Sequence, residues 1–78
     1  MARITVSHIV FTNGVGQVSV ATEGYTLSSN AFAVGRESNA SLSVAYVKGN
    51  SSNNTVTVGL TNTTYSGGFT FAVLYFLS

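Results

Sequence analysis

Near its C-terminus the chain carries the nine-residue run FTFAVLYFL, which begins at Phe69 and ends at Leu77. Side chains alternate between the two faces of an extended strand. One face carries Phe69, Phe71, Val73, Tyr75 and Leu77, and the other carries Ala72, Leu74 and Phe76. Strands that are covered on both sides have this composition. We therefore predict a strand over residues 69–77, with the hydrophobic core on one face and a second cover on the other.

Upstream of this run, short alternating stretches are separated by turn signals. Residues 3–11 place Ile4, Val6, His8 and Val10 on one face and Arg3, Thr5, Ser7, Ile9 and Phe11 on the other. Further strands are predicted around Val18 and Val20, at residues 25–27, around Phe32 and Val34, at 42–46 (with Leu42, Val44 and Tyr46 on one face) and at 55–60. Turns or loops are predicted at Asn13-Gly14, Glu23-Gly24, 28–30, 36–39, 49–54 and 61–68, because Gly, Asn and Ser accept turn conformations.

The sequence lacks the i, i+3, i+4 apolar spacing, flanked by caps, that is typical of an amphipathic helix. We therefore predict an all-β fold, a small antiparallel β-sandwich or barrel of about six to seven strands with no significant helix. Residues 1–78 form one β domain in this prediction, and the chain, which starts at Met1, is expected to be a complete short protein. A domain to which a methionine was added is the alternative.

The small size of the chain favours self-association. A domain of this length gains only about 3–5 kcal/mol from a single core. The 78 residues include no cysteine and one histidine, so neither a disulfide nor a zinc cluster is expected to add stability. Oligomerisation is the remaining common route, and we expect a homo-oligomer.

Charged residues make up 6% of the chain, with a formal net charge of +1, whereas about 25% is usual. Three dispersed cations do not form the basic face that phosphate recognition requires, so no nucleic-acid partner is expected. The longest apolar run is less than half of the ~20 residues that a spanning helix needs, and the N-terminus lacks the apolar segment of a signal peptide. We expect a soluble protein without a membrane partner, whose uncharged surface is largely covered in its assembly.

No catalytic site, metal site or cofactor is predicted. His8 is the only side chain whose unperturbed charge changes near neutral pH, and the chain contains no aspartate for a catalytic triad. Glu23 and Glu37 are candidates for a carboxylate pair, but so small a domain rarely builds the cleft that such a pair needs. We interpret both as surface charges and His8 as a strand residue. The Asn-x-Ser/Thr sequences at Asn39, Asn50, Asn53 and Asn62 are attributed to chance.

Two loops are candidates for contact with a ligand or partner, because Tyr, Ser, Gly and Asn are typical of adaptable binding loops. The candidate residues are Asn50, Asn53 and Asn54 in the first loop, and Tyr65, Gly67 and Gly68 in the second. Solvated hairpin loops are the alternative interpretation. For the C-terminal strand we predict self-association through Phe69, Phe71, Leu74, Tyr75, Phe76 and Leu77, and a central barrel strand is the alternative.

The stretch VTVGLTNTTYSGGFTF, residues 56–71, resembles small β-domains of bacteriophage virions. Tail-fibre tips and lectin-like fibre domains carry a valine-rich strand, an Asn-Thr loop, a Gly-Phe pair and a terminal aromatic strand, which Gly68-Phe69 and Tyr75-Phe76 match here. The resemblance covers about the last 25 residues, and the fibre shaft that usually precedes such tips is missing. It implies a capsid decoration or cement protein, or a small accessory protein, that forms trimers; no functional residue is carried over.

The leading hypothesis is therefore a virion structural protein that self-associates, most simply as a homotrimer, and docks on other virion proteins of a capsid or tail. The first alternative is an extracellular carbohydrate- or receptor-binding module of a tail fibre, with Tyr65 and the residue 50–54 loop at a site for a cell-surface glycan. The second is a subunit of an extracellular filament. Nothing in the sequence supports an enzyme.

Overall fold

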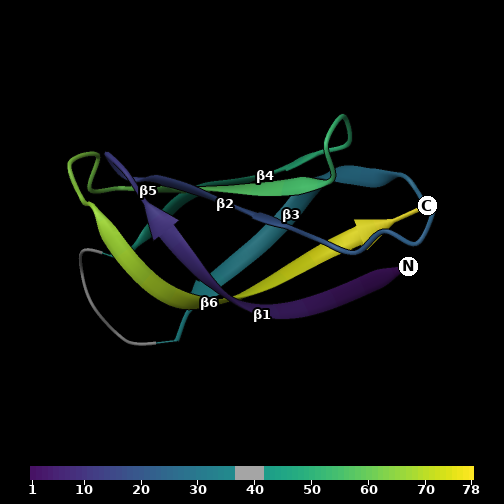
Figure 1. Cartoon of the computed structure of the whole chain (residues 1–78), viewed down its shortest axis with the longest axis horizontal. Helices are drawn as coiled ribbons and strands as arrows, with labels where there is room; N and C mark the ends of the chain where they lie inside the picture. The colour runs from purple at the N-terminus through teal and green to yellow at the C-terminus, as the bar shows by residue number, and fades with distance from the viewer. Residues whose placement is uncertain (37–41) are drawn as a thin grey trace.

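The computed structural model describes residues 1–36 and 42–78, and this part of the chain forms six strands. They are β1 (Ala2–Phe11), β2 (Val15–Ser19), β3 (Leu27–Gly35), β4 (Val44–Asn50), β5 (Thr55–Leu60) and β6 (Gly67–Leu77). The strands pair antiparallel in the order β1-β6-β3-β4-β5-β2 and curl into a nearly closed barrel (Figure 1). The predicted all-β fold is confirmed. Residues 37–41, which include most of the predicted 36–39 loop, Asn39 and Ser41, lie outside the described residues.

The longest strand, β6, lies in the middle of one half of the barrel. Leu74 of β6 pairs with Ile4 of β1 on one side and with Phe32 of β3 on the other. The chain ends meet beside this strand, because the N-terminal ammonium group of Met1 donates a 2.7 Å hydrogen bond to the carbonyl oxygen of Leu77. The C-terminal run is therefore a central strand of the barrel, paired on both edges.

Asn13 and Gly14 form the predicted hairpin turn, with φ angles of 50° and 77°, as a two-residue turn with two left-handed positions requires. Beyond the turn, β1 and β2 pair only through Thr12 and Val15. They then separate, since β1 continues along β6 and β2 continues along β5. Gly16 lies where they cross: a Cβ there would be 2.6 Å from Ile9 Cγ2. The separation of these strands leaves the one break in the ring of described strands.

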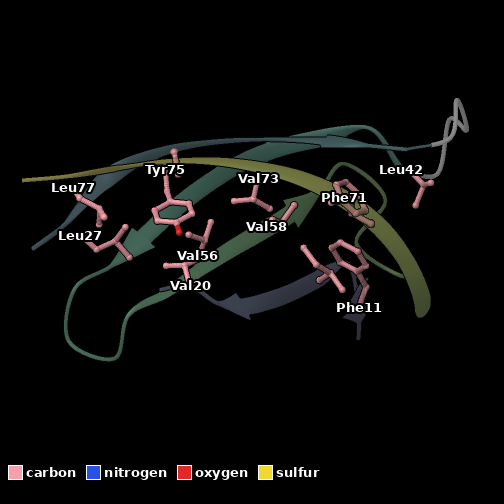
Figure 2. Close-up of a cluster of buried hydrophobic side chains, with 13 residues drawn as sticks. Phe11, Val20, Leu27, Leu42, Val56, Val58, Phe71, Val73, Tyr75 and Leu77 are labelled. Carbon is pink, nitrogen blue, oxygen red and sulfur yellow. The ribbon is translucent and has the colours of Figure 1, made fainter. Parts of the chain in front are cut away.

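The core fills the barrel between its two curved halves (Figure 2). Ile9, Phe71, Val56, Val58 and Val73 have no exposed surface, and Phe11 is 1% exposed. The rings of Phe11 and Phe71 lie 5.3 Å apart. On β6, Phe71, Val73, Tyr75 and Leu77 all point inward, so one of the two apolar faces of this strand forms the core. The neighbours of Phe71, Val73 and Tyr75 across the sheet are small or polar, for example Ser7 and Gly35 beside Phe71.

Two register shifts alter the predicted pattern, and a shift by a single residue also reverses the alternation of the side chains beyond it. The register of β3 against β6 shifts between Leu27 and Ala31, so residues 28–30, predicted as a turn, continue the strand. Of the strand predicted at residues 25–27, only Leu27 belongs to β3, which continues without interruption through Phe32 and Val34. The register of β4 shifts between Val44 and Tyr46. Tyr46, predicted to share a face with Val44, is therefore 50% exposed.

Candidate interaction surface

The outward side of β1, β6 and β3 carries an apolar surface arranged in rows across the three strands. One row is Val6, Ala72 and Val34, and the next is Ile4, Leu74 and Phe32. Phe76 follows on β6, opposite Ala2. We call Ile4, Val6, Phe32, Val34, Ala72, Leu74 and Phe76 the outer apolar face. Four of these side chains, those of Ile4, Val6, Phe32 and Val34, are between 61% and 71% exposed.

The relief of the outer apolar face is set by the sizes of its side chains. The ring of Phe32, which is 61% exposed, and the half-buried ring of Phe76 pack edge to face with centroids 6.3 Å apart, and we call this pair the aromatic ridge. A dip lies beside them, lined by Ile4, Phe32, Ala33, Val34, Ala72 and Leu74. It exists because alanine occupies the middle of the row between Val6 and Val34. The aromatic ridge therefore lies next to the dip on the same surface.

Charged side chains of the described residues lie elsewhere. Arg3 alternates to the other side of β1 and donates a 2.7 Å hydrogen bond to Glu23, on the connection between β2 and β3. Lys48 lies on β4 and Arg36 follows β3. Glu37, the other half of the predicted carboxylate pair, lies outside the described residues. An apolar surface without charges to repel a neighbour is suited to protein contact rather than to exposure to water.

The structure divides the residues predicted to self-associate into two groups. Leu74 and Phe76 point outward and are half-buried, whereas Phe71, Tyr75 and Leu77 are core residues with 0%, 4% and 2% exposure. Phe69 is half-buried and packs against the Tyr65 ring at 6.2 Å. The three core residues are not accessible to a second chain in this fold, because the alternation of β6 directs them into the barrel. A surface contact is therefore restricted to Leu74 and Phe76 among the six.

Tyr65 closes one end of the barrel. Its ring is half-buried and packs edge to face against Phe11, at 6.3 Å. Its carbonyl oxygen accepts a 2.8 Å hydrogen bond from the backbone of Gly14. Gly67 begins β6 at φ 155° beneath the Tyr65 hydroxyl group, and a Cβ there would be 2.9 Å from that oxygen. Tyr65 thus has a structural role that the loop composition did not indicate.

The loop between β4 and β5 is a hairpin turn held by its own side chains. The amide group of Asn50 donates to the hydroxyl oxygens of Thr55 and Thr57, at 3.1 and 2.9 Å. The Thr55 hydroxyl group donates to Asn53 Oδ1 at 2.7 Å. Asn54 takes a left-handed φ of 55°. The side chains of Asn50 and Asn53 are therefore engaged in hydrogen bonds within the turn.

The two predicted binding loops do not form one site. The hairpin precedes β5 and the Tyr65 loop follows it, and a strand of six residues is about 20 Å long. Figure 1 shows the two loops at opposite ends of the barrel. A single site that combines Tyr65 with residues 50–54 is therefore ruled out by the geometry. The order of the strands in the barrel, which could not be predicted from the sequence, determines that the two loops lie apart.

His8 and Gly68 face each other on the outer side of β1 and β6. The contact is diagonal, since His8 pairs with Thr70 and Gly68 pairs with Val10, and the imidazole ring lies over the glycine, whose Cβ would meet it. Across residues 1–36 and 42–78, no group of three or more His, Cys, Asp or Glu side chains could hold a metal ion. The same residues form no helix long and apolar enough to cross a membrane. His8 is accordingly described as a strand residue packed on Gly68.

Sequence reasoning missed four members of the surface, those on β1 and β3. The alternation of residues 3–11 placed Ile4 and Val6 on one face, and this was the available signal. Comparison with known proteins adds no further constraint: scans against family models, curated proteins and solved structures each found no match to this chain. The outer apolar face is therefore the feature on which a functional argument rests.

Proposed function

We propose that this protein is a structural subunit that self-associates through its outer apolar face and docks on a larger assembly. The resemblance of residues 56–71 to small virion β-domains makes that assembly a bacteriophage capsid or tail. The subunit acts as a decoration, cement or accessory protein. The protein works by multivalent burial of uncharged surface, not by catalysis.

The observation that carries the proposal is the exposure of Ile4, Val6, Phe32 and Val34 on one continuous surface. Isolated exposed apolar residues are ordinary, but a contiguous patch marks an interaction site. The sparse charge supports the same function, since a free monomer normally carries about 2–8 net charges for solubility and this chain carries +1.

Size-exclusion chromatography with light scattering tests the self-association. We expect an oligomer at micromolar concentration, and we expect Leu74→Asp or Phe76→Asp to shift it toward the monomer while the barrel stays folded. Tyr25→Asp is the control, because Tyr25 is 49% exposed but lies on the β2–β3 connection. A stable wild-type monomer overturns self-association.

Electron microscopy of the native particle tests the location. We expect the subunit at regular positions on a capsid or tail. Open-ended fibres formed by the purified protein would instead support the filament alternative, because a contact that does not close generates a helical array.

A carbohydrate- or receptor-binding module is the second candidate, and one observation favours it. A hollow beside the ridge is lined by Ser28, Asn30, Ala31, Phe32, Val47 and Phe76, so aromatic rings and hydrogen-bonding groups lie together, as in sugar sites. A glycan array distinguishes the candidates. Reproducible binding that Phe32→Ala abolishes and Tyr65→Phe leaves intact would favour this module.

A further inference from the structure

The outer apolar face is complementary to a second copy of itself. We propose that two chains pack these faces together about a twofold axis that runs across the strands at Leu74, so that Phe76 of each chain fills the dip over Ala72 of the other. This geometry rests on the proposed function, because it specifies how the self-association occurs.

The spacing of the outward side chains along β6 allows the two outer apolar faces to fit together. Ala72, Leu74 and Phe76 follow one another at every second residue on the outward side, about 6.6 Å apart. A twofold axis at Leu74 therefore exchanges the positions of residues 72 and 76. The smallest of these three side chains then faces the largest. Faces of two sheets pack about 10 Å apart with interdigitated side chains, which is the arrangement that a ridge and a dip allow.

The flanking strands β1 and β3 extend the contact between the two outer apolar faces. The same axis places β1 over β1 and β3 over β3 of the second copy, so Ile4 and Phe32, in the row of Leu74, face their own counterparts. Val34 lines the dip and Val6 pairs with Ala72, so in this geometry both contact the ring of Phe76 of the other chain. In an isologous contact, both partners use the same surface patch.

Size and charge are compatible with a closed dimer. A standard interface takes about 800 Å² from each partner, which is under a fifth of the 4436 Å² surface of this chain, and the face spans three of the six strands. Among the described residues, its border carries the polar residues His8 and Thr70 at one end and Ser28 and Asn30 at the other. An apolar centre within a polar rim is the usual anatomy of an interface. The symmetry gives a dimer, in place of the trimer that the resemblance implies.

The first experiment compares two positions on one strand. Val6 and Val10 both point outward from β1 and are 68% and 65% exposed, but only Val6 pairs with Ala72 of the dip; Val10 lies beyond His8, opposite Gly68. In sedimentation equilibrium, Val6→Lys should weaken the dimer tenfold or more (roughly 1.4 kcal/mol), whereas Val10→Lys should change its dissociation constant by less than about threefold. Equal weakening by both variants overturns the proposed position of the contact.

The second experiment exchanges the two facing side chains. Phe76→Ala leaves a void and Ala72→Phe fills the dip, so each alone should weaken the dimer about tenfold or more. The double variant Ala72→Phe with Phe76→Ala restores one large and one small side chain at each contact. Its affinity should return to within about threefold of the wild-type value. Thermal unfolding of each variant at low concentration confirms that the barrel is intact.

The outcomes separate this geometry from the proposed function. If the double variant is weaker than either single variant, or if the wild-type oligomer contains three chains, the twofold arrangement is wrong while self-association stands. If the wild type is monomeric at the highest accessible concentration, both are overturned.

Discussion

The hydroxyl group of Tyr75 donates a 3.0 Å hydrogen bond to the carbonyl oxygen of Ala21, although 54 positions separate the two residues. Tyr75 is 4% exposed, so the bond connects the buried side of β6 to the β2–β3 connection. Thr26, on that connection, exchanges backbone hydrogen bonds of 2.8 and 3.0 Å with Ser78. The end of the barrel where the termini meet is therefore held by a connection that belongs to no strand.

Tyr75→Phe tests this bond. Removal of the hydroxyl group leaves the Ala21 carbonyl without its donor, so the free energy of unfolding should fall by about 1 kcal/mol, and by up to about 3 kcal/mol if water does not replace it. Urea unfolding followed by circular dichroism measures the change. The exposed Tyr25→Phe serves as control and should alter stability by less than about 0.5 kcal/mol. An equal effect of both variants would contradict a role for the bond.

Gly16→Ala tests the crossing of β1 and β2. The added methyl group meets Ile9 Cγ2 at 2.6 Å and the Val10 carbonyl oxygen at 2.8 Å, so the strands must move apart. We expect a loss of about 1–3 kcal/mol of stability, as for other overpacked positions. Gln17→Ala, at the exposed neighbouring position, should have little effect. Chemical denaturation measures both, and an unchanged midpoint for Gly16→Ala would argue against close crossing.

Phe71 and Phe76 lie on opposite faces of β6. Substitution of Phe71 should therefore lower the stability of the fold, whereas substitution of Phe76 should weaken self-association. Phe71→Ala empties a fully buried position and should cost about 3–5 kcal/mol, which is comparable to the whole stability of a domain this small. We expect it to be largely unfolded. Phe76→Ala should retain the circular dichroism spectrum of the wild type and lose affinity for a second copy. The reverse pattern would show that Phe76, and not Phe71, faces the core.

Asn54 tests the turn between β4 and β5. Its φ of 55° is in the left-handed region, which costs most residues about 1–2 kcal/mol and glycine almost nothing. Asn54→Gly should therefore preserve the melting temperature, whereas Asn54→Ala should lower it by about 4–8 °C, the shift expected for 1 kcal/mol in a domain of this length. Ser52→Ala, an exposed change in the same turn, should be neutral. Equal melting temperatures for the glycine and alanine variants would refute the assigned conformation.

Several parts of the fold followed from local patterns. Asn13-Gly14 predicted a hairpin because both positions tolerate positive φ, and both adopt it. The run from Phe69 to Leu77 predicted a strand with two apolar faces, and its inward residues are buried. Val56 and Val58 alternate as predicted and have no exposed surface. These patterns are visible in the sequence because they depend on neighbours in the chain.

Bulges and loop positions did not follow from the sequence. An extra residue between Val44 and Tyr46 reverses the side to which Tyr46 points, and no residue type marks the site. The residues around Tyr65 have the composition of a binding loop, yet the ring of Tyr65 packs on Phe11. That contact joins residues that are distant in the chain, so local sequence carried no sign of it.

The sequence by itself determined a β-strand protein with few charges, a hairpin at Asn13-Gly14 and a C-terminal strand that needs cover on both faces. Only the tertiary structure decided which face of β1 points inward. Ile4 and Val6 are more apolar than Thr5 and Ser7, but they lie outside. The reason is that Ile9 and Phe11, on the same side of β1 as Thr5 and Ser7, fill the core at 0% and 1% exposure, and the alternation of the strand then directs Ile4 and Val6 outward. The apolar side of β1 is thereby left on the surface.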